Sequence, residues 1–262
     1  MKKFLALALC VMMCLTAFTA CSDSSRENKL IMGTSADYPP FEFHMISDEG
    51  KDVITGIDVS VAEQIAADMG KEIEVNDMGF NNLLTALDKG DIDLVVAAME
   101  RDPKREGSAD YSDAYYSDVP YMILVRKADL NKFTDKNSFA GVTVGAQTGT
   151  MMESIVTDDL TGADLMSLTS VTDLVNNLVY EKCGALVLNG AVAQDYAASN
   201  PELAVSPIEL DKCPTYHVAV AEGDPKGLLE GINASIAKMN ESGAIDEFIK
   251  QAEADSAFAL VG

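Results

Sequence analysis

The sequence predicts an α/β fold of two lobes joined by a hinge that the chain crosses twice. Short apolar runs alternate with amphipathic helical patterns along most of the chain, which indicates largely parallel sheets covered by helices. Extended apolar segments at residues 120–126 and 216–221 fit two passages between the lobes. The length of 262 residues allows one large or two medium domains.

The first α/β set precedes residue 120, and apolar periodicity identifies its elements. Gly70 and Gly90 follow two helical patterns, at the place where glycine accepts the left-handed backbone that ends a helix. Asn81 is placed to cap the second helix. We predict strands at residues 29–33, 71–77 and 91–98, and helices at residues 59–69 and 82–89.

Asp102 and Pro103 indicate a further helix start, with a capping side chain followed by proline at the first helical position. Arg105 then lies in the first turn, near the carboxyl end of the strand at 91–98, where ligands bind in open α/β sheets. Its guanidinium could grip a carboxylate through two parallel hydrogen bonds. Taken alone, an exposed arginine paired with Glu106 or Asp110 is the simpler interpretation.

A second α/β set follows the first passage. We predict strands at residues 142–146 and 185–188, and helices at residues 151–157, 171–180 and 191–199. The strand at 216–221 returns to the first lobe, and helices at 225–239 and 244–251 close it. Lobe 1 is therefore expected to contain residues 29–119 and 215–262, and lobe 2 residues 120–214, with a ligand cleft between them.

Residues 1–20 have the pattern of a signal peptide. Lys2 and Lys3 precede an apolar stretch that is shorter than the about 20 residues of a spanning helix. Small residues before Cys21 indicate a lipoprotein, with acyl chains such as palmitate on Cys21 and residues 21–28 as a polar tether. The alternative is an ordinary secretory signal. We expect the protein in the cell envelope, lipid-anchored to the outer face of the cell membrane, or periplasmic if an outer membrane exists.

The composition excludes several partners. The 42 acidic residues outnumber the 19 Lys and Arg residues, and the formal net charge is −23. Such a surface repels nucleic acid and anionic lipid. Cys183 is expected away from the cleft and Cys213 near a passage between the lobes, which argues against a disulfide between them.

Several motifs occur in a fixed order: residues 33–41 (GTSADYPPF), residues 56–58 (GID), residues 78–87 (MGFNNLLTAL), Arg105, and residues 145–150 (GAQTGT). Together, from about residue 30 to about residue 251, they resemble the polar amino-acid family of ABC-transporter solute-binding proteins. The resemblance implies a type II periplasmic-binding-protein fold, an amino acid as ligand, the transmembrane subunits of an ABC permease as partner, a monomer, and no cofactor.

By this resemblance, Arg105 binds the α-carboxylate of the ligand, and the turn from Gln147 to Thr150, with Met151, contributes from lobe 2. Backbone N–H groups at the start of a helix suit an anion, and Thr150 and Glu153 have the spacing of a capping box. Tyr38 and Phe80 match the aromatic walls of the family's site. A plain turn and two core aromatics are the structural alternatives.

Two positions depart from the family pattern. Glu100 stands where the family usually has Thr or Ser, and Asn189 where it has Asp; both family residues contact the α-ammonium. One hypothesis is a relocated anchor, in which Glu100 holds the ammonium and Asn189 keeps a hydrogen bond. The equally weighted alternative is that Glu100 pairs with Arg101 or Arg105, or points to solvent.

Ser35 stands where relatives that bind cationic amino acids often have Asp. This favours a neutral ligand, unless Asp37 or Glu42 reaches the site. Met99 and Met151 would add an adaptable apolar lining, whereas Met152 is expected in the core. The predicted ligand-binding residues are Ser35, Tyr38, Phe80, Ala98, Met99, Glu100, Arg105, Gln147, Thr150, Met151 and Asn189.

The sequence offers little for catalysis. His44 and His217 are far apart and have no cysteine or carboxylate at metal-ligand spacing, so neither a metal site nor an enzyme is expected. Two alternatives to a transport receptor remain. One is an enzyme resembling the cyclohexadienyl-acid dehydratases of this superfamily, with Glu100 as general acid; the other is a ligand-sensing adaptor.

Overall fold

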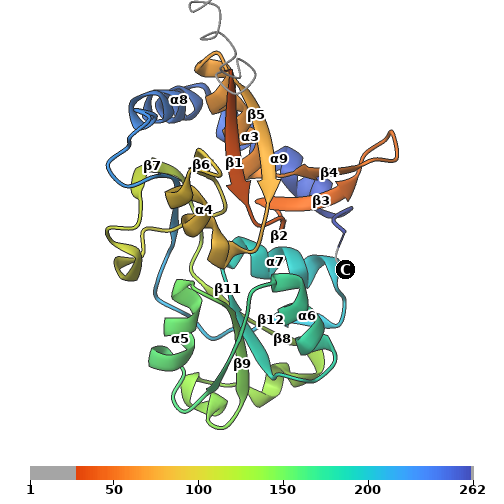
Figure 1. The fold of residues 1–262 in the computed structure, drawn as a ribbon. Coiled ribbons are helices and arrows are strands. Elements are labelled where there is room, and N and C mark those ends of the chain that lie inside the picture. Colours follow the sequence, from red (N-terminus) through yellow and green to blue (C-terminus); the bar gives the residue numbers. More distant parts are fainter. Residues whose placement is uncertain (1–27, 261–262) are drawn as a thin grey trace, which may run out of the picture.

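The computed structural model describes residues 28–260, and its two five-stranded sheets lie in separate lobes (Figure 1). The predicted signal peptide, Cys21 and nearly all of the predicted tether lie outside the described residues. The mixed α/β architecture of two lobes predicted from the sequence is confirmed. Both sheets also contain antiparallel strands, so they are less regular than the predicted parallel sheets.

The sheet of lobe 1 has the order β5-β1-β6-β13-β7. Strands β5 and β6 run parallel to β1, whereas β13 is antiparallel to both of its neighbours. The strands are β1 (Lys29–Thr34), β5 (Glu72–Asp77), β6 (Leu94–Val95), β7 (Asp110–Ser117) and β13 (Thr215–Val220).

Helices cover both faces of this sheet because successive strand side chains point to opposite sides. Leu94 and Val96 belong to the main core, and Val95 and Ala97 belong to a smaller core on the other face. The helices are α3 (Ile57–Asp68), α4 (Leu83–Lys89), α8 (Leu229–Ser242) and α9 (Ala244–Ser256).

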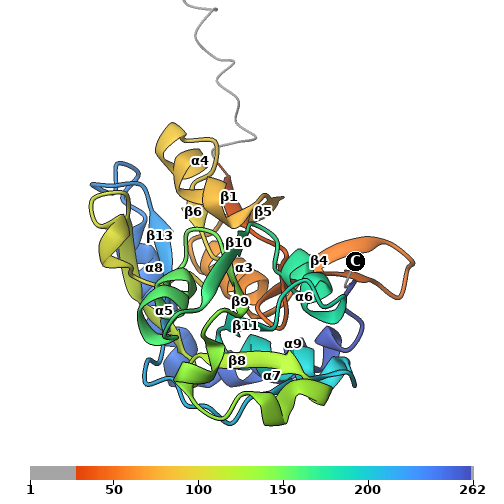
Figure 2. The ribbon, with the colours of Figure 1, turned by 90° about the horizontal axis from the view of Figure 1, so that it is seen from below.

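The sheet of lobe 2 has the order β10-β9-β11-β8-β12. Figure 2 shows α5 and α6 to either side of β9. The strands are β8 (Met122–Arg126), β9 (Thr143–Gln147), β10 (Asp164–Leu168), β11 (Ala185–Leu188) and β12 (Leu203–Val205), and the helices are α5 (Met151–Asp159), α6 (Val171–Val179) and α7 (Gly190–Ser199). Short 3₁₀ turns are η1 (Phe80–Asn82), η2 (Pro103–Arg105), η3 (Lys127–Lys132) and η4 (Lys136–Phe139).

The two passages between the lobes lie side by side. The N–H of Asp118 donates to the carbonyl of Pro214 at 3.0 Å, and that of Tyr121 donates to Lys212 at 3.0 Å. The segment predicted as the first passage, 120–126, is instead mostly strand β8, whose apolar run pairs with β11 and β12. The hinge therefore consists of a short link before β8 and a longer one after β12.

A small sheet of β2 (Asp37–Tyr38), β3 (Glu42–Ile46) and β4 (Asp52–Thr55) was not predicted. Its strands are short, with 2, 5 and 4 residues, and they mix polar and apolar side chains. The chain end adds an isolated bridge between Met45 and Ala259. Strands β7 and β10, which also mix polar and apolar side chains, and the short apolar strand β12 were missed as well.

The predicted strand at 91–98 pairs only at Leu94–Val95. The side chain of Asp93 accepts the N–H of Ile31 at 2.7 Å, in place of a ladder bond. Ala98 has φ 43°, which bends the chain and directs its N–H to Asp58 at 2.6 Å. The expected strand end is thus a bent segment that places Ala98 and Glu100 at the lobe boundary.

Three predicted helix starts are wrong. Asn81 does not cap α4, because η1 precedes that helix. After Pro103, the chain forms a single 3₁₀ turn, although Asp102 does accept the N–H of Lys104 at 2.8 Å as a cap. Helix α8 begins at Leu229, four residues late, because Asp224 accepts the N–H groups of Leu228 and Leu229.

We expect Gly56→Ala to lower the free energy of unfolding by about 3 kcal/mol or more. Gly56 has φ 129°, and an added Cβ would lie 2.1 Å from the carbonyl oxygen of Phe41. Urea unfolding measures the loss. The control is Gly50→Ala, where φ is 73° and no atom lies within 4 Å of the added Cβ, so only about 1 kcal/mol is expected. Equal losses in both variants would contradict this account.

Candidate functional site

A cavity lies between the lobes and is lined from both sides. Its free space is about 10 Å³, about enough for one water molecule. A larger ligand therefore requires the lobes to move apart and side chains to rotate. The lining residues are Ser35, Tyr38, Glu42, Phe80, Ala97, Ala98, Glu100 and Arg105 from lobe 1, and Gln147, Thr150, Met152 and Asn189 from lobe 2.

Two of the predicted residues do not line this cavity. Met99 is fully buried in the smaller core of lobe 1, and Met151 packs against the main core. Met152 lines the cavity instead, because successive helical residues point about 100° apart and Met152 shares the buried face of Ile155 and Val156. The other nine predicted residues all line the cavity.

Arg105 is held at the cavity by its own loop. Its Nη2 donates to the carbonyl of Glu100 at 3.2 Å, and its guanidinium lies 5.6 Å from the centre of the Phe80 ring. The Nε lies 3.8 Å from a carboxylate oxygen of Asp102, and it is buried without a hydrogen bond. The pairing with Glu106 or Asp110, considered from the sequence, does not occur. A guanidinium with an unfilled N–H is suited to an anion.

Glu100 forms no ion pair with either neighbouring arginine among the described residues. Its carboxylate accepts the hydroxyl of Tyr121 and, at 3.4 Å, the Nδ2 of Asn189. Arg101 turns away and donates to the carbonyl of Ser112 at 2.6 Å. Burial raises the pKa of Glu100, and the Tyr121 hydroxyl, Asn189 and Arg105 oppose this effect.

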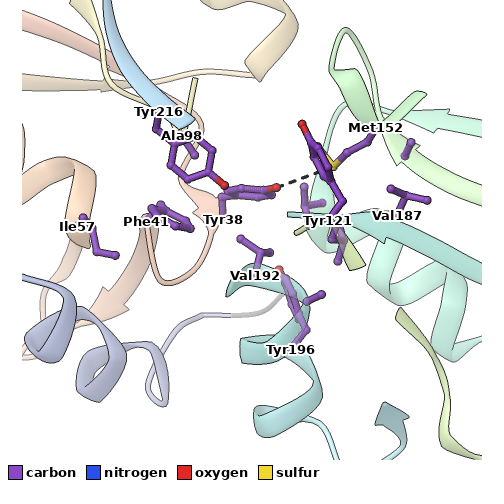
Figure 3. Packing of buried hydrophobic residues seen from close by; sticks show 14 of the residues in the cluster. Tyr38, Phe41, Ile57, Ala98, Tyr121, Met152, Val187, Val192, Tyr196 and Tyr216 are labelled. Atoms are coloured by element: carbon purple, nitrogen blue, oxygen red, sulfur yellow. Dashed lines mark hydrogen bonds between the residues drawn. The ribbon is translucent and has the colours of Figure 1, made fainter. Parts of the chain in front are cut away.

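Asn189 connects the cavity to the hinge. Its Oδ1 accepts the hydroxyl of Tyr38 from lobe 1, and its Nδ2 donates to Tyr216 at 2.6 Å. The hydroxyl of Tyr216 in turn donates to Asp118 at 2.5 Å, in the first passage between the lobes. Figure 3 shows Tyr38, Tyr121 and Tyr216 gathered at this junction. This network makes the cavity and the hinge one connected polar unit.

The turn before α5 does not form the predicted capping box. Thr150 donates its hydroxyl to the carbonyl of Gln147 at 2.7 Å, and its side chain caps no N–H. Glu153 accepts the N–H of Gly149 at 2.9 Å and the hydroxyl of Ser167 at 2.6 Å. The turn is thus fixed by its own residues and by β10.

Glu42 was not among the predicted ligand-binding residues, yet it lines the cavity and is 1% exposed. It contacts Asp58, which is fully buried and accepts the N–H of Ala98 and the hydroxyl of Tyr115 at 2.8 Å. Burial raises the pKa of Asp58 to about 7 and that of Glu42 further above its usual value. Two touching buried carboxyl groups cannot both be ionised. Because Asp58 already receives two donors, Glu42 is the carboxyl group favoured to hold the shared proton, and its Oε2 has no hydrogen-bond partner.

The signal for Glu42 in the sequence was its place between Phe41 and Phe43, since alternation along β3 puts it on the face opposite Phe43. Ala97 was not predicted, because the bend at Ala98 is not visible in the sequence. Neither histidine lines the cavity.

Within residues 28–260, no group of His, Cys, Asp and Glu side chains could hold a metal ion. No helix in that range is long and apolar enough to cross a membrane. Cys183 is buried and Cys213 is exposed, and they form no disulfide.

Comparisons with known proteins agree with this geometry. Residues 30–252 match the model of the bacterial extracellular solute-binding proteins, family 3. The arginine-binding extracellular protein ArtP of Bacillus subtilis (strain 168) is 34% identical over 96% of this chain and 98% of its own. A probable histidine-binding protein of Campylobacter jejuni is 29% identical over 97% of this chain and 99% of its own.

A solved structure shows the same fold. It is the amino acid ABC transporter substrate-binding protein AbpA from Streptococcus pneumoniae Canada MDR_19A, bound to L-arginine. Its TM-score is 0.83 at 31% identity, and the match covers 89% of this chain and 98% of that one.

We expect Tyr216→Phe to lower the free energy of unfolding by about 1–3 kcal/mol, because it leaves the buried Asn189 Nδ2 without a good acceptor. Urea unfolding measures the change. Tyr180→Phe is the matched control, since Tyr180 is 71% exposed, and it should unfold like the unmodified protein. A loss below about 0.5 kcal/mol for Tyr216→Phe would show that the network adds nothing to stability.

Proposed function

Because the chain belongs to the bacterial extracellular solute-binding proteins of family 3, we propose that it captures an amino acid between its lobes and delivers it to an ABC permease. The relatives that it matches are binding proteins of transporters rather than enzymes. The dehydratase alternative is therefore not retained. The observation that carries the proposal is the cavity itself. Its lining combines the guanidinium of Arg105 with the carboxyl groups of Glu42 and Glu100.

Arg105 is the proposed partner of the ligand's α-carboxylate. It is the one Arg or Lys among the cavity-lining residues, and its side chain is 14% exposed. A carboxylate would fill the unused N–H groups that the Glu100 carbonyl and Asp102 leave open. Backbone N–H groups at Thr150 and Met151 are the proposed contacts from lobe 2. The ligand would then bridge both lobes and favour their closure.

Glu100 is the proposed partner of the α-ammonium. Its contact with Asn189 is long, at 3.4 Å, so a charged donor would displace it readily. An ionised carboxylate in this buried place is costly without a cation, and the raised pKa of Glu100 reflects that cost. The absence of an ion pair to Arg101 or Arg105 among the described residues supports the relocated anchor over internal pairing.

The neutral ligand predicted from Ser35 and a cationic ligand make different demands on Glu42. A cationic ligand would need Asp37 or Glu42 at the site. Asp37 does not line the cavity, but Glu42 does, so this requirement is met. A cation beside Glu42 would release its proton and pair with the carboxylate. We therefore favour an arginine-like ligand, in line with the names of the relatives.

The lipid anchor at Cys21, a monomeric state and the lobe boundaries at residues 119/120 and 214/215 complete the proposal. An anchored monomer would hold the captured amino acid close to the transmembrane subunits of the permease.

The test is calorimetric titration of residues 22–262 with arginine, lysine, glutamine and leucine. We expect arginine to bind most tightly, with an affinity that rises with pH by up to about tenfold per unit. The reason is that Glu42 has a raised pKa when the ligand is absent and must lose its proton to pair with a cation. The gain is therefore present above the raised pKa of Glu42 and is lost as the pH falls through it.

Glu42→Gln is the control for this titration, and it should remove the extra pH dependence that arginine shows over glutamine and leucine. Glu100, whose pKa is also raised, faces the α-ammonium of every amino acid, so its part of the pH dependence should remain. Tight binding of neutral amino acids alone would return the ligand to the neutral class. No binding of any amino acid would refute the proposed function.

We expect Glu100→Thr to weaken amino-acid binding at least about tenfold, through loss of a charge-assisted hydrogen bond. Adding Asn189→Asp to this variant restores the arrangement that the family usually has, and should recover most of the affinity. Titration calorimetry measures both variants. Tighter binding by Glu100→Thr alone would mean that Glu100 neutralises Arg105 instead of anchoring the ligand.

A further inference from the structure

The N-terminus of helix α6 in lobe 2 has two caps, and one of them comes from lobe 1. Ser170, its own capping residue, accepts the N–H of Asp173 at 3.2 Å. The N–H of Val171 donates instead to Asp37 at 2.7 Å. The first N–H groups of a helix have no partner within the helix, so Asp37 satisfies a donor that α6 cannot satisfy alone.

Asp37 is a residue of lobe 1, in strand β2 beside Tyr38. Helix α6 packs against this strand and lies below β2 in Figure 1. A second contact joins the same places, because Tyr196 of α7 donates its hydroxyl to the carbonyl of Asp37 at 3.3 Å. The segment that carries the aromatic wall of the cavity is thus tied to two helices of the other lobe.

The surroundings of Asp37 within lobe 1 stabilise its charge only weakly, through one long hydrogen bond. Its nearest polar side chain there is Ser35, whose hydroxyl lies 3.4 Å away, and the facing ionisable group is Asp77, which repels it. No Lys or Arg pairs with it among the described residues. The shorter hydrogen bond to its carboxylate, 2.7 Å from the N–H of Val171, comes from lobe 2, where the positive end of the α6 dipole also favours an anion.

We propose that Asp37 is a positioning residue for lobe closure, which caps α6 across the cleft and stabilises the closed arrangement independently of the ligand. Opening the cleft exposes the carboxylate and the N–H of Val171 to water, so the cap exists only when the lobes meet. Asp37 does not line the cavity. Asp37 therefore affects the equilibrium between the open and closed arrangements of the lobes, which is the same for every ligand, and not the choice of ligand.

The first measurement is amino-acid affinity of Asp37→Ala and Asp37→Asn. We expect Asp37→Ala to raise Kd about 5- to 20-fold, mostly through faster dissociation, and by the same factor for every ligand that binds. Asp37→Asn keeps an acceptor but loses the charge, so its Kd should lie between those of Asp37→Ala and the unmodified protein. Asp48→Ala is the matched control, because it removes an exposed carboxylate from the same lobe and should leave Kd unchanged.

The second measurement needs no ligand, so its outcome does not depend on the proposed function. The affinity measurement does rest on that function, because it requires an amino acid that binds. Fluorophores on Glu63→Cys in α3 and Asp158→Cys in α5, both exposed positions, report the distance between the lobes in a Cys213→Ser background. Asp37→Ala should shift the ligand-free distance distribution toward the open arrangement. If no amino acid binds, the proposed function fails, while this distance still decides the role of Asp37.

Val171→Pro tests the same hydrogen bond from the other lobe. It removes the N–H at the first helical position, where proline is well accepted, and Ser170 already has the extended ψ of 130° that proline requires before it. Asp37→Ala should then raise Kd less in this background than in the unmodified protein. An unchanged distance distribution in Asp37→Ala, a factor that differs among ligands, or full additivity with Val171→Pro would each overturn the proposal.

Discussion

The closed arrangement of this protein depends on buried polar groups whose partners lie in the other lobe. Tyr38 and Asn189 bond across the cleft, and Asp37 completes the hydrogen bonds of α6 from the far side. A buried donor or acceptor without a partner costs about 1–3 kcal/mol. Each lobe therefore carries groups that are satisfied either by water in an open cleft or by the other lobe in a closed one, and this choice is what a ligand can bias.

The charges around the cavity follow from the same constraint. Arg105 is the one cation lining it, and Glu100 and Glu42 are the acidic groups. Asp58 behind Glu42 accepts hydrogen bonds from Ala98 and Tyr115, and burial raises the pKa of Glu42, so Glu42 favours its neutral form in the absence of a cation. A site of this kind suits a molecule that carries both signs of charge, which is the character of an amino acid.

The hinge and the cavity share residues. Asp118 and Tyr121 lie in the first passage between the lobes, and each bonds to a group at the cavity: Asp118 through Tyr216 to Asn189, and Tyr121 directly to Glu100. The two passages are themselves hydrogen-bonded to each other. Glu100 and Asn189 are thus connected to the hinge through two hydrogen bonds or fewer.

The sequence by itself determined the α/β class, most helices of both lobes, the capped turn that carries Arg105, and nine of the residues that line the cavity. These depend on periodicity, on proline and glycine positions and on motif order, which are local properties. Tertiary structure alone decided that Met152 and not Met151 faces the cavity, that Glu42 meets Asp58, and that Asp37 caps a helix 134 residues away. The physical reason is that such contacts join segments that are distant along the chain, and whether a carboxylate faces solvent, a cavity or another lobe depends on how both lobes pack.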